Sequence, residues 1–406
     1  MSQVSLSVLM AVLILIIGQA RADTLRIYID ADYSISKDAA DAIELGIRTA
    51  LDEVGSQVAG HIIEIVPQNH QANSKRSFRT MQAFLEDPSA LALFGGMHSP
   101  PYLTYKDYIN QNRLLTLLPW SAAGPITRAS FDDENWIFRL SVDDSKAGQF
   151  LIDQAYVHGD CRNISLLLMD TGWGRANLKT MSAALRKHGL AAAYSHLFPA
   201  TISQHVADYV ARNVAAASAD CVILLATAQA GIHLTHSLHR LEQTPRIFSH
   251  WAILGRDYPR NVSHKVRAEV DLRVLQTCGL RVEQTNKTVL VQALENAAAE
   301  LGSLADVSAP TGFVHGYDLT RIMIAATRQA SQTTRWHKSI EEKRAAVKEA
   351  LEALVEPVQG ILRTYNRPFQ RYHHKQPDAH EALGAADLCM AAFRRDGKLR
   401  DASQKP

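Results

Sequence analysis

Three histidines spaced three residues apart, His233, His236 and His239, have the first pattern in the chain that could bind a metal ion. Helix neighbours three apart share a face, so two of these imidazoles could reach one ion. The third drifts around the helix and no supporting carboxylate is evident, which favours ordinary surface histidines. The pair His373 and His374 is a weaker candidate, and no Cys-x-x-Cys spacing occurs. We therefore expect no metal and no cofactor.

Motifs of nucleotide-dependent and hydrolytic enzymes are absent from the sequence. Gly172-x-Gly174 is only a fragment of a G-x-G-x-x-G turn, and neither a G-x-x-x-x-G-K-[ST] loop nor a G-x-S-x-G elbow occurs. Asp143 and Asp144 could act as an acid pair, but capping of a helix is the more common role of such residues. We expect that the protein is not an enzyme.

A different chemistry is suggested by the stretch Leu91–Ala123, where an apolar strand runs into a glycine turn and a helix start. Ser99 stands at the position of an N-cap, and Pro100 at the first helical position, where a missing N–H costs nothing. Such a tip combines free N–H groups with a hydroxyl and can hold a carboxylate. The alternative is an ordinary strand–turn–helix connection.

Polar and aromatic side chains recur where other apolar strands end. Ligands of open α/β sheets bind beyond the carboxyl ends of the strands, so these side chains are candidates for the walls of a cleft. A tryptophan in a loop can also simply cover a core. The candidate ligand-binding residues are Tyr33, His98, Ser99, Trp120, Ser121, Trp173 and Trp251.

The elements that must position these residues alternate between strand and helix, which predicts parallel sheets flanked by helices. The alternation begins at Thr24–Ile29 and starts again at Ile164–Met169, so the chain contains two α/β units of similar plan. Gly189 follows a predicted helix at the position of a left-handed C-cap. Later helices are expected near Thr288–Leu301, Thr311–Gln329 and Ile340–Val355, and a last strand at Leu388–Phe393.

Length and charge narrow the class of protein. A chain of 406 residues can form two domains, and a formal net charge of +2 without a long basic run argues against a nucleic-acid partner. Leu6–Ile17 is an apolar run, and Ala20-x-Ala22 supplies the small residues of a signal-peptidase site. We expect residues 1–22 to be a cleaved signal peptide, although no Lys or Arg precedes the run. The alternative is an uncleaved anchor.

Four widely spaced cysteines, Cys161, Cys221, Cys278 and Cys389, leave the disulfide pattern open. An oxidising compartment permits a bridge, but sequence cannot assign pairs. Cys221 begins the apolar run CVILLA, which favours a small buried hydrophobic residue.

The order of motifs resembles the bacterial periplasmic solute-binding proteins of the leucine/isoleucine/valine-binding type, over almost all of Thr24–Leu399. The motifs are Glu44-Leu45-Gly46, Gly95–Ser99, Pro119, Ile137-Phe138-Arg139 with Asp144 and Gly148, Trp173-Gly174, and Tyr317-Asp318.

The resemblance implies the type 1 periplasmic-binding fold: two Rossmann-like lobes with parallel sheets, joined by three crossover segments. We place the crossovers near Leu140–Asp144, Gln276–Gly279 and Glu356–Gly360. The expected first lobe comprises 23–141 plus 280–356, the second lobe 142–279 plus 357–400, and 401–406 a disordered tail.

The resemblance also implies roles for single residues. Ser99 would bind a ligand carboxylate, the backbone N–H of Trp120 would assist, Trp173 would stack on the ligand and Tyr33 would close the pocket. Ala122 departs from the family, which has a hydroxyl three residues after the strand-end proline. Trp251, after His250, stands where the family has the carboxylate that holds an ammonium group, which weakens the case for an α-amino acid.

The implied function is the periplasmic substrate-binding component of an ABC importer, which captures a small polar solute (an amino acid, amide or carboxylate) by lobe closure. Its partners would be the solute and a membrane permease, and a monomer is expected. The alternative is a periplasmic sensor subunit that reports to a membrane signalling protein.

Overall fold

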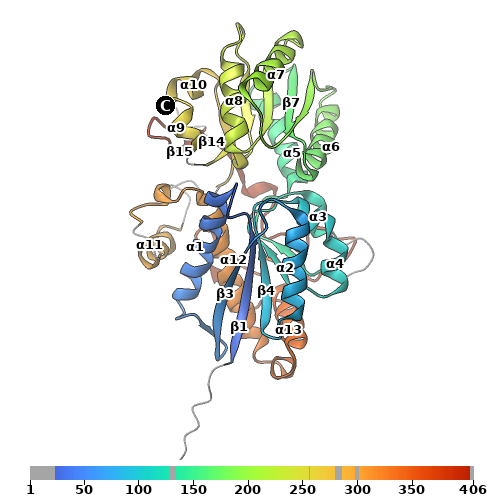
Figure 1. Ribbon diagram of the computed structural model, residues 1–406, viewed down its shortest axis with the longest axis vertical. Helices are drawn as coiled ribbons and strands as arrows, with labels where there is room; N and C mark the ends of the chain where they lie inside the picture. The colour runs from blue at the N-terminus through green and yellow to red at the C-terminus, as the bar shows by residue number, and fades with distance from the viewer. Residues whose placement is uncertain (1–22, 129–133, 256, 279–285, 298–300, 403–406) are drawn as a thin grey trace, which may run out of the picture.

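The computed structural model describes residues 23–128, 134–255, 257–278, 286–297 and 301–402. It consists of two lobes, one above the other in Figure 1, and each lobe contains a sheet covered by helices. The expected signal peptide, residues 1–22, lies outside the described residues. No helix within the described ranges is long and apolar enough to cross a membrane.

The sheet of the first lobe has the strand order β2-β3-β1-β4-β5-β6 and is parallel except for the short β2 at its edge. Its inner strand β4 is buried at every residue, as a parallel strand covered on both faces requires. The strands are β1 (Thr24–Ala31), β2 (Gln57–Val58), β3 (His61–Asn69), β4 (Ala90–Gly95), β5 (Thr116–Leu118) and β6 (Ile137–Arg139). The helices are α1 (Lys37–Asp52), α2 (Ser74–Glu86), α3 (Pro100–Thr104), α4 (Lys106–Gln111), α11 (Lys287–Asn296), α12 (Pro310–Ala330) and α13 (Ile340–Glu352).

The sheet of the second lobe has the order β15-β14-β11-β10-β9-β7-β8, with parallel strands from β11 to β8 and antiparallel β14 and β15 at one edge. The strands are β7 (Ile164–Met169), β8 (Ser195–Phe198), β9 (Cys221–Leu225), β10 (Arg246–Ser249), β11 (Arg273–Thr277), β14 (Leu388–Phe393) and β15 (Leu399–Asp401). The helices are α5 (Asp144–Asp153), α6 (Gly172–Lys187), α7 (Gln204–Ala216), α8 (Ala228–His239), α9 (Asp257–Asn261) and α10 (His264–Glu269).

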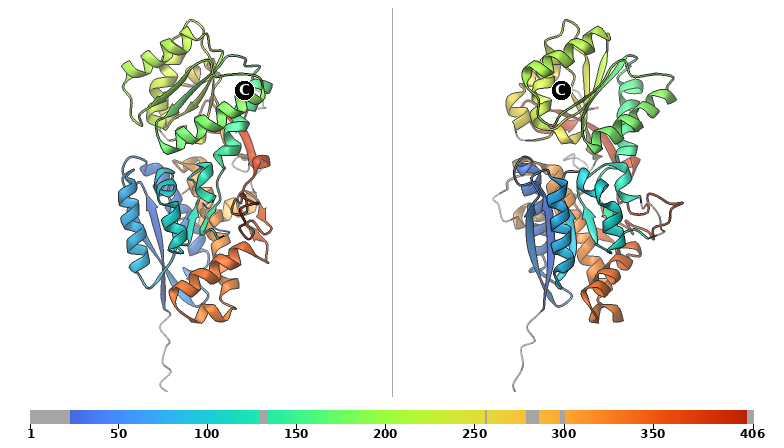
Figure 2. Two further views of the ribbon diagram at one scale, coloured as in Figure 1. Left: turned by 90° about the vertical axis from the view of Figure 1, so that its right-hand side faces the viewer. Right: turned by 45° about the vertical axis from the view of Figure 1, so that its right-hand side comes forward.

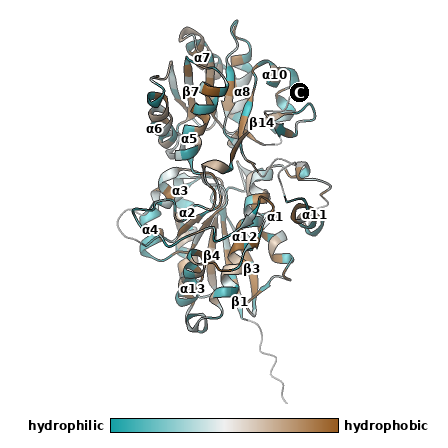
Figure 3. Ribbon diagram, turned by 180° about the vertical axis from the view of Figure 1, so that it is seen from behind, coloured by the Kyte–Doolittle hydropathy of each residue, from teal (hydrophilic) through white to brown (hydrophobic). Residues whose placement is uncertain are grey.

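Hydrophobic residues concentrate on the strands, and outer helices such as α6 carry many hydrophilic ones (Figure 3). The expected elements are confirmed, with small shifts in their ends: the helix expected at Thr288–Leu301 is observed over Lys287–Asn296. Gly189 has φ +72°, which confirms the left-handed C-cap after α6. Asp143 caps α5 through a bond from the N–H of Ser145 (2.9 Å), as the capping interpretation predicted.

Helices α1 and α12 pack with their backbones in close approach. A Cβ added to Gly46 would lie 2.2 Å from the carbonyl oxygen of Phe313, and one added to Gly316 would lie 2.7 Å from that of Ile43. Both positions therefore require glycine for steric reasons. This contact fastens the late helix α12 onto the first lobe, although more than 250 residues separate it from α1.

All four cysteines form disulfides, and both bridges lie in the second lobe. Cys161 pairs with Cys221 across a Cα–Cα distance of 5.9 Å, and Cys278 pairs with Cys389 across 4.9 Å. The interpretation of Cys221 as a free hydrophobic residue is therefore wrong. The apolar run does bury Cys221, but the fold places Cys161, just before β7, beside the first residue of the neighbouring strand β9.

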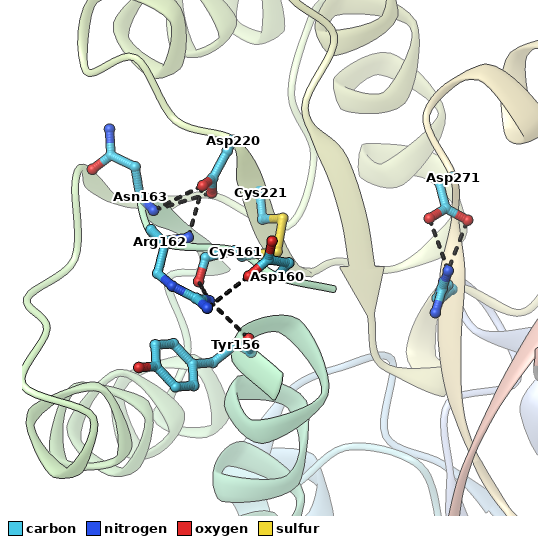
Figure 4. Close-up of a disulfide and its surroundings, with 9 residues drawn as sticks. Tyr156, Asp160, Cys161, Arg162, Asn163, Asp220, Cys221 and Asp271 are labelled. Atoms are coloured by element: carbon cyan, nitrogen blue, oxygen red, sulfur yellow. Dashed lines mark hydrogen bonds and ion pairs between the residues drawn. A yellow bond between two sulfur atoms is a disulfide. The ribbon is translucent and has the colours of Figure 1, made fainter. Parts of the chain in front are cut away.

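Polar contacts surround the first bridge (Figure 4). The backbone N–H of Arg162 donates to Oδ2 of Asp220 (2.7 Å), and the backbone N–H of Asn163 donates to Oδ1 of Asp220 (3.1 Å). Cys161, Asp220 and Cys221 bring possible metal ligands together, but both sulfur atoms are consumed by the disulfide. The arrangement therefore joins the start of β7 to that of β9.

Two of the passages between the lobes lie at the start and at the end of the second-lobe segment that runs from α5 to β11. β6 ends at Arg139 in the first sheet, and α5 begins at Asp144 and packs against α6 in the second lobe. β11 belongs to the second sheet up to Thr277, and residues 279–285 lie outside the described ranges.

For the third passage we propose a later position than the one expected from the sequence. The hairpin of β12 (Val358–Gln359) and β13 (Thr364–Tyr365) and the residues after it pack on the first lobe, where Phe369 and His380 contact Phe138 of β6. Figure 2 shows the red C-terminal segment rising from the lower lobe to the upper one. We therefore propose a crossover between residues 384 and 387 instead of Glu356–Gly360, because these aromatic contacts hold residues 369–380 on the first lobe.

Candidate functional site

A cavity of about 60 Å³ lies between the lobes, where strands of both sheets reach their carboxyl ends. We call it the interlobe cavity. The first lobe contributes Met97, His98, Ser99, Pro100, Trp120 and Ala122, and the second contributes Met169, Thr171, Trp173, Thr227, His250, Trp251 and Ala252. Among these described residues, none is Lys, Arg, Asp or Glu. Tryptophan and histidine therefore dominate the chemistry of the cavity wall.

Five of the seven residues expected from the sequence, His98, Ser99, Trp120, Trp173 and Trp251, line this cavity together. Tyr33 and Ser121 are not among the lining residues. The cavity lies at strand ends, where the rule for open α/β sheets places a ligand.

Other lining residues, among them His250 and Thr227, were missed. Each follows a second-lobe strand directly, His250 after β10 and Thr227 soon after β9. The strand-end rule would have found both if it had been applied to every residue that follows a second-lobe strand instead of only to the tryptophans there.

Ser99 does not cap a helix through its side chain, so that part of the sequence interpretation is wrong. Its own backbone is helical (φ −78°, ψ −32°), and its Oγ accepts a bond from the N–H of Ala123 (3.2 Å). The physical reasons are that Pro101, at the second helical position, has no N–H to donate to a cap, and that Ser99 lacks the extended backbone of a capping residue. The helix that follows, α3, has only 5 residues.

The hydroxyl of Ser121 shapes the turn beside the cavity. Its single O–H is shared between the carbonyl oxygens of Gly96 (2.7 Å) and His98 (3.0 Å), and the residue is fully buried. Ser121 therefore joins the loop after β5 to the loop after β4 and holds His98 in place.

Tyr33 is engaged on the first lobe. Its hydroxyl donates to Oε2 of Glu44 (2.6 Å), and its backbone N–H donates to Oδ1 of Asn69 (3.1 Å). The pKa of Tyr33 is raised well above its usual range, mainly by burial and to a smaller extent by the hydrogen bond to Glu44. The side chain therefore stays a neutral phenol, and its two bonds tie it to α1 and the end of β3.

His98 is backed by a buried carboxylate. Its Nε2 lies 3.2 Å from Oδ2 of Asp32 and 3.1 Å from Oγ of Ser36. Burial by itself would raise the pKa of Asp32, but hydrogen bonds from His98 and from the N–H groups of Ile35 and Ser34 together hold it well below the usual range. Asp32 is therefore ionised at neutral pH.

His250 has a similar partner in the second lobe. Its Nε2 lies 3.1 Å from Oδ1 of Asp144, close enough for an ion pair although the two atoms are not aligned as a hydrogen bond. The other oxygen of Asp144 accepts a bond from Nδ2 of Asn177 (2.9 Å). Asp144 lies in the first turn of α5, where the helix dipole stabilises a negative charge.

The tryptophans differ in how firmly they are packed. Trp120 is almost fully buried, and its ring edge packs against Gly312 of α12, where an added Cβ would lie 2.8 Å away. Trp251 makes edge contacts with His250 and His315 at centroid distances of 4.7 and 5.7 Å. Trp173 is only half-buried, in the first turn of α6. Trp173 therefore has the most freedom to contact a ligand.

His315 of α12 connects the lobes beside the cavity. Its Nδ1 lies 2.9 Å from the carbonyl oxygen of Pro119 at the end of β5, and its Nε2 lies 3.1 Å from Oγ1 of Thr277 at the end of β11. Burial lowers the pKa of His315 to about 4, so the ring is neutral at pH 7. One neutral side chain thus spans the point at which the two sheets meet.

The histidine triplet of α8 lies away from the interlobe cavity, and its members have separate partners. His233 bonds Gln204 (3.0 Å), His236 bonds the carbonyl oxygen of Asn261 (2.9 Å), and His239 pairs with Glu269. These contacts support the interpretation as ordinary surface histidines.

Comparisons with known proteins agree on one family. The sequence model described as "Periplasmic binding protein" matches residues 29–380. The comparison with curated protein sequences gives no match.

Solved structures resemble the whole chain at low sequence identity. A type 1 periplasmic binding protein from Bordetella pertussis Tohama I has a TM-score of 0.74 at 13% identity, with 93% of this chain and 99% of that chain covered. A solute-binding protein of an ABC transporter from Rhodopseudomonas palustris HaA2, solved with p-hydroxybenzoic acid, has a TM-score of 0.73 at 15% identity. The match covers 93% of this chain and 96% of that chain. A leucine-binding protein from Thermotoga maritima MSB8 has a TM-score of 0.70 at 12% identity, and the match covers 93% of this chain and 97% of that chain.

The two lobes, their mostly parallel sheets and the cavity at the strand ends are the architecture of a type 1 periplasmic binding fold. The family is made up of periplasmic proteins that bind small solutes. With a match that spans most of its length, this chain belongs to the periplasmic binding protein family.

Proposed function

We propose that this protein is the periplasmic substrate-binding component of an ABC importer and that it captures a small polar solute in the interlobe cavity by closure of the lobes. The observation that carries the proposal is the cavity itself, whose wall joins strand ends of both lobes. A solute that contacts both walls favours the closed arrangement by its differential affinity.

The small size of the cavity supports capture by movement of the lobes. Sites for small molecules usually enclose about 300–1,000 Å³. The interlobe cavity has about 60 Å³, so a solute larger than a few water molecules needs the walls to separate before it can enter. Trp173, half-buried on the second lobe, then covers the solute as the lobes close.

We further propose that residues 1–22 are removed as a signal peptide and that the mature chain begins at Asp23. The support is the apolar run of Leu6–Ile17 followed by Ala20-x-Ala22. N-terminal sequencing of the protein from a periplasmic extract tests this. Retention of Met1 in a membrane fraction would contradict it.

The function is tested by purifying the protein from periplasm without unfolding and identifying bound molecules by native mass spectrometry. The solute found is then titrated against solute-free wild type and Trp173→Ala. We expect about a tenfold loss of affinity, because an aromatic contact contributes about 1 kcal/mol beyond the area it buries. Tyr209→Ala, an exposed aromatic change on α7, is the matched control. Absence of any bound solute, or equal affinity of Trp173→Ala and wild type, would overturn the proposal.

A further inference from the structure

A second cavity, of about 670 Å³, lies on the first lobe and shares no lining residue with the interlobe cavity. We call it the outer pocket. Its walls come from the C-terminal end of α1, from α11, which lies beside α1 in Figure 1, from α12, and from the segment that follows α13. Sites for small molecules usually enclose about 300–1,000 Å³, so the outer pocket has room for a small molecule as it stands.

Helix α12 reaches the surface mainly where it borders the outer pocket. Every residue from Thr311 to Thr320 is buried. In the next nine residues, those that are not buried also line the pocket, and they are Arg321, Ala325, Arg328 and Gln329. Their spacing of four, three and one residues places them on one face of the helix. Both arginines therefore belong to the face of α12 that forms the pocket wall.

Hydrogen bonds hold another part of the wall in place. Nε2 of Gln329 donates to the carbonyl oxygen of Ala353 (3.0 Å), and Oε1 of Gln329 accepts a bond from the N–H of Val355 (3.0 Å). One side-chain amide thus attaches the segment after α13 to α12. On this segment Leu354 is buried, whereas Val355 is 75% exposed, and both line the pocket. The wall is therefore both held in place and apolar, which suits a ligand with an apolar body.

Two of the charged residues in this wall bind each other. Oε2 of Glu53 accepts a bond from Nη1 of Arg321 (2.8 Å), and Oε1 of Glu53 accepts one from the hydroxyl of Tyr317 (2.6 Å). Both oxygens of this carboxylate are therefore engaged. Arg321 uses only Nη1, which also lies 2.7 Å from the hydroxyl of Tyr317, and its other two nitrogens make no bond to the described residues. The pair thus keeps spare N–H donors but no free carboxylate oxygen.

The other two charged residues of the wall, Arg328 and Glu356, have no hydrogen-bond or ion-pair partner in the described part of the chain, and both are exposed. A guanidinium carries five N–H donors in a planar fork that fits a carboxylate. With the spare donors of Arg321, two turns away on the same face of α12, the pocket needs acceptors more than donors. The carboxylate of Glu356 repels a second negative charge, so these groups together favour a ligand with one negative charge.

We propose that the outer pocket is a second binding site of this protein, for a small organic anion that has one negative charge and an apolar body, such as a monocarboxylate. Arg328 binds the anionic group, and Leu354 and Val355 contact the apolar body. The site goes beyond solute capture in the interlobe cavity. Because its walls belong to the first lobe alone, its ligand does not have to wait for the lobes to open or close.

The site is tested with anilinonaphthalene sulfonate, an organic anion with one charge whose fluorescence rises in an apolar site, titrated against the full mature protein at pH 7.5. We expect saturable binding that hexanoate reverses and the uncharged hexanamide does not. Arg328→Gln should weaken binding about fivefold and Glu356→Gln should tighten it about twofold, because the first change removes the attracting charge and the second the repelling one. Arg186→Gln, an exposed arginine in the last turn of α6 as Arg328 is in that of α12, is the matched control.

A second pair of variants tests the apolar part of the wall. Val355→Asp puts a negative charge beside the expected position of the apolar body and should weaken binding about tenfold. Val157→Asp, at a position 60% exposed on the second lobe, is its control and should bind as wild type does. Trp173→Ala should also leave binding of the probe unchanged, which separates the outer pocket from the interlobe cavity. Melting temperatures measured without the probe show that each variant is folded.

The proposal is overturned if the probe does not bind, or if Arg328→Gln and Arg186→Gln bind it equally well. Weaker binding by Glu356→Gln would show that the pocket takes a cationic or zwitterionic ligand instead. Sedimentation of the wild type that reveals a dimer, dissociated by Val355→Asp, would assign the pocket to a second copy of the chain and would equally overturn the proposal.

Discussion

The two lobes share one architecture but are stabilised by different interactions. The first lobe contains no cysteine and is held together by buried polar contacts and by close helix packing, whereas both disulfides lie in the second lobe. In the first lobe the guanidinium of Arg139 makes two bonds to Glu381 (2.8 and 2.6 Å), and Asp318 accepts bonds from Ile361, Leu362 and Tyr365.

This difference should make the lobes sensitive to different conditions. Buried charges and carboxyl groups respond to pH and to removal of a partner, while disulfides respond to the redox state of the compartment. The second lobe is therefore the one whose stability depends on oxidising conditions. The following predictions test this contrast, from the largest expected effect to the smallest.

Glu381→Ala should cost about 3–5 kcal/mol of unfolding free energy, because it leaves the fully buried Arg139 without its main counter-charge. Calorimetric melts at pH 7 measure the loss. Asp378→Ala, which removes a half-exposed partner of Arg128 and Lys146, is the control and should cost less than about 1 kcal/mol. Equal losses for the two variants would show that the buried pair has no special part in the first lobe.

The double change Cys161→Ser plus Cys221→Ser should destabilise the second lobe by about 2–4 kcal/mol, because the open chain gains conformational entropy. Amide hydrogen exchange should show faster opening of β7 and β9, with the first sheet protected. The matched pair Cys278→Ser plus Cys389→Ser opens a loop of 111 residues instead of 60 and should cost about 0.5 kcal/mol more. Loss of protection in β1 and β4 would contradict the contrast between the lobes.

Asp318→Asn should remove part of the pH dependence of the first lobe. Burial raises the pKa of Asp318 to about 6, above 3.8 for an ordinary aspartate, although its three hydrogen bonds oppose this. The stabilising protonated form is fully present below about pH 4 and is lost as the pH rises through 6. Wild type should therefore lose about 3 kcal/mol relative to the variant between pH 4 and 7.

Denaturant titrations at several pH values measure this difference, with the exposed Asp41→Asn as control. Asp30, whose pKa burial also raises to about 6, keeps its own share of the pH dependence in the variant. A wild-type stability that rises over the same pH range relative to Asp318→Asn would refute the sign.

Gly46→Ala should cost about 1–2 kcal/mol. The new methyl group would meet the carbonyl oxygen of Phe313 and force α1 away from α12, while alanine recovers part of the loss through its higher helix propensity. Thermal melts of the variant and of Gly302→Ala, where the nearest atom lies 3.5 Å from an added Cβ, give the comparison. A neutral effect of Gly46→Ala would mean that the two helices can separate freely.

Much of the fold was predictable because apolar runs and helical periodicity are local. The strands at Ile164–Met169 and Leu388–Phe393 and the left-handed Gly189 were found from a few neighbouring residues. The strand-end rule similarly identified His98, Trp120, Trp173 and Trp251 as cavity residues, since parallel strands bring their carboxyl ends to one edge.

Local pattern failed where the deciding partner is distant in sequence. Ser99 has the sequence signature of a cap, but its hydroxyl bonds Ala123, on the loop after the next strand. The sequence predicts that Cys221 is one residue of an apolar strand, and only the pairing of β7 with β9 brings Cys161 beside it.

By itself the sequence determined the two α/β units, the strand ends that carry aromatic residues, and the resemblance to a solute-binding family. The tertiary structure alone decided that Asp32 backs His98, that Asp144 backs His250, and that residues 369–380 return to the first lobe. The physical reason is the separation along the chain over which each effect acts. Backbone propensity and apolar periodicity act within a few residues, whereas hydrogen bonds and ion pairs join any groups that packing brings together.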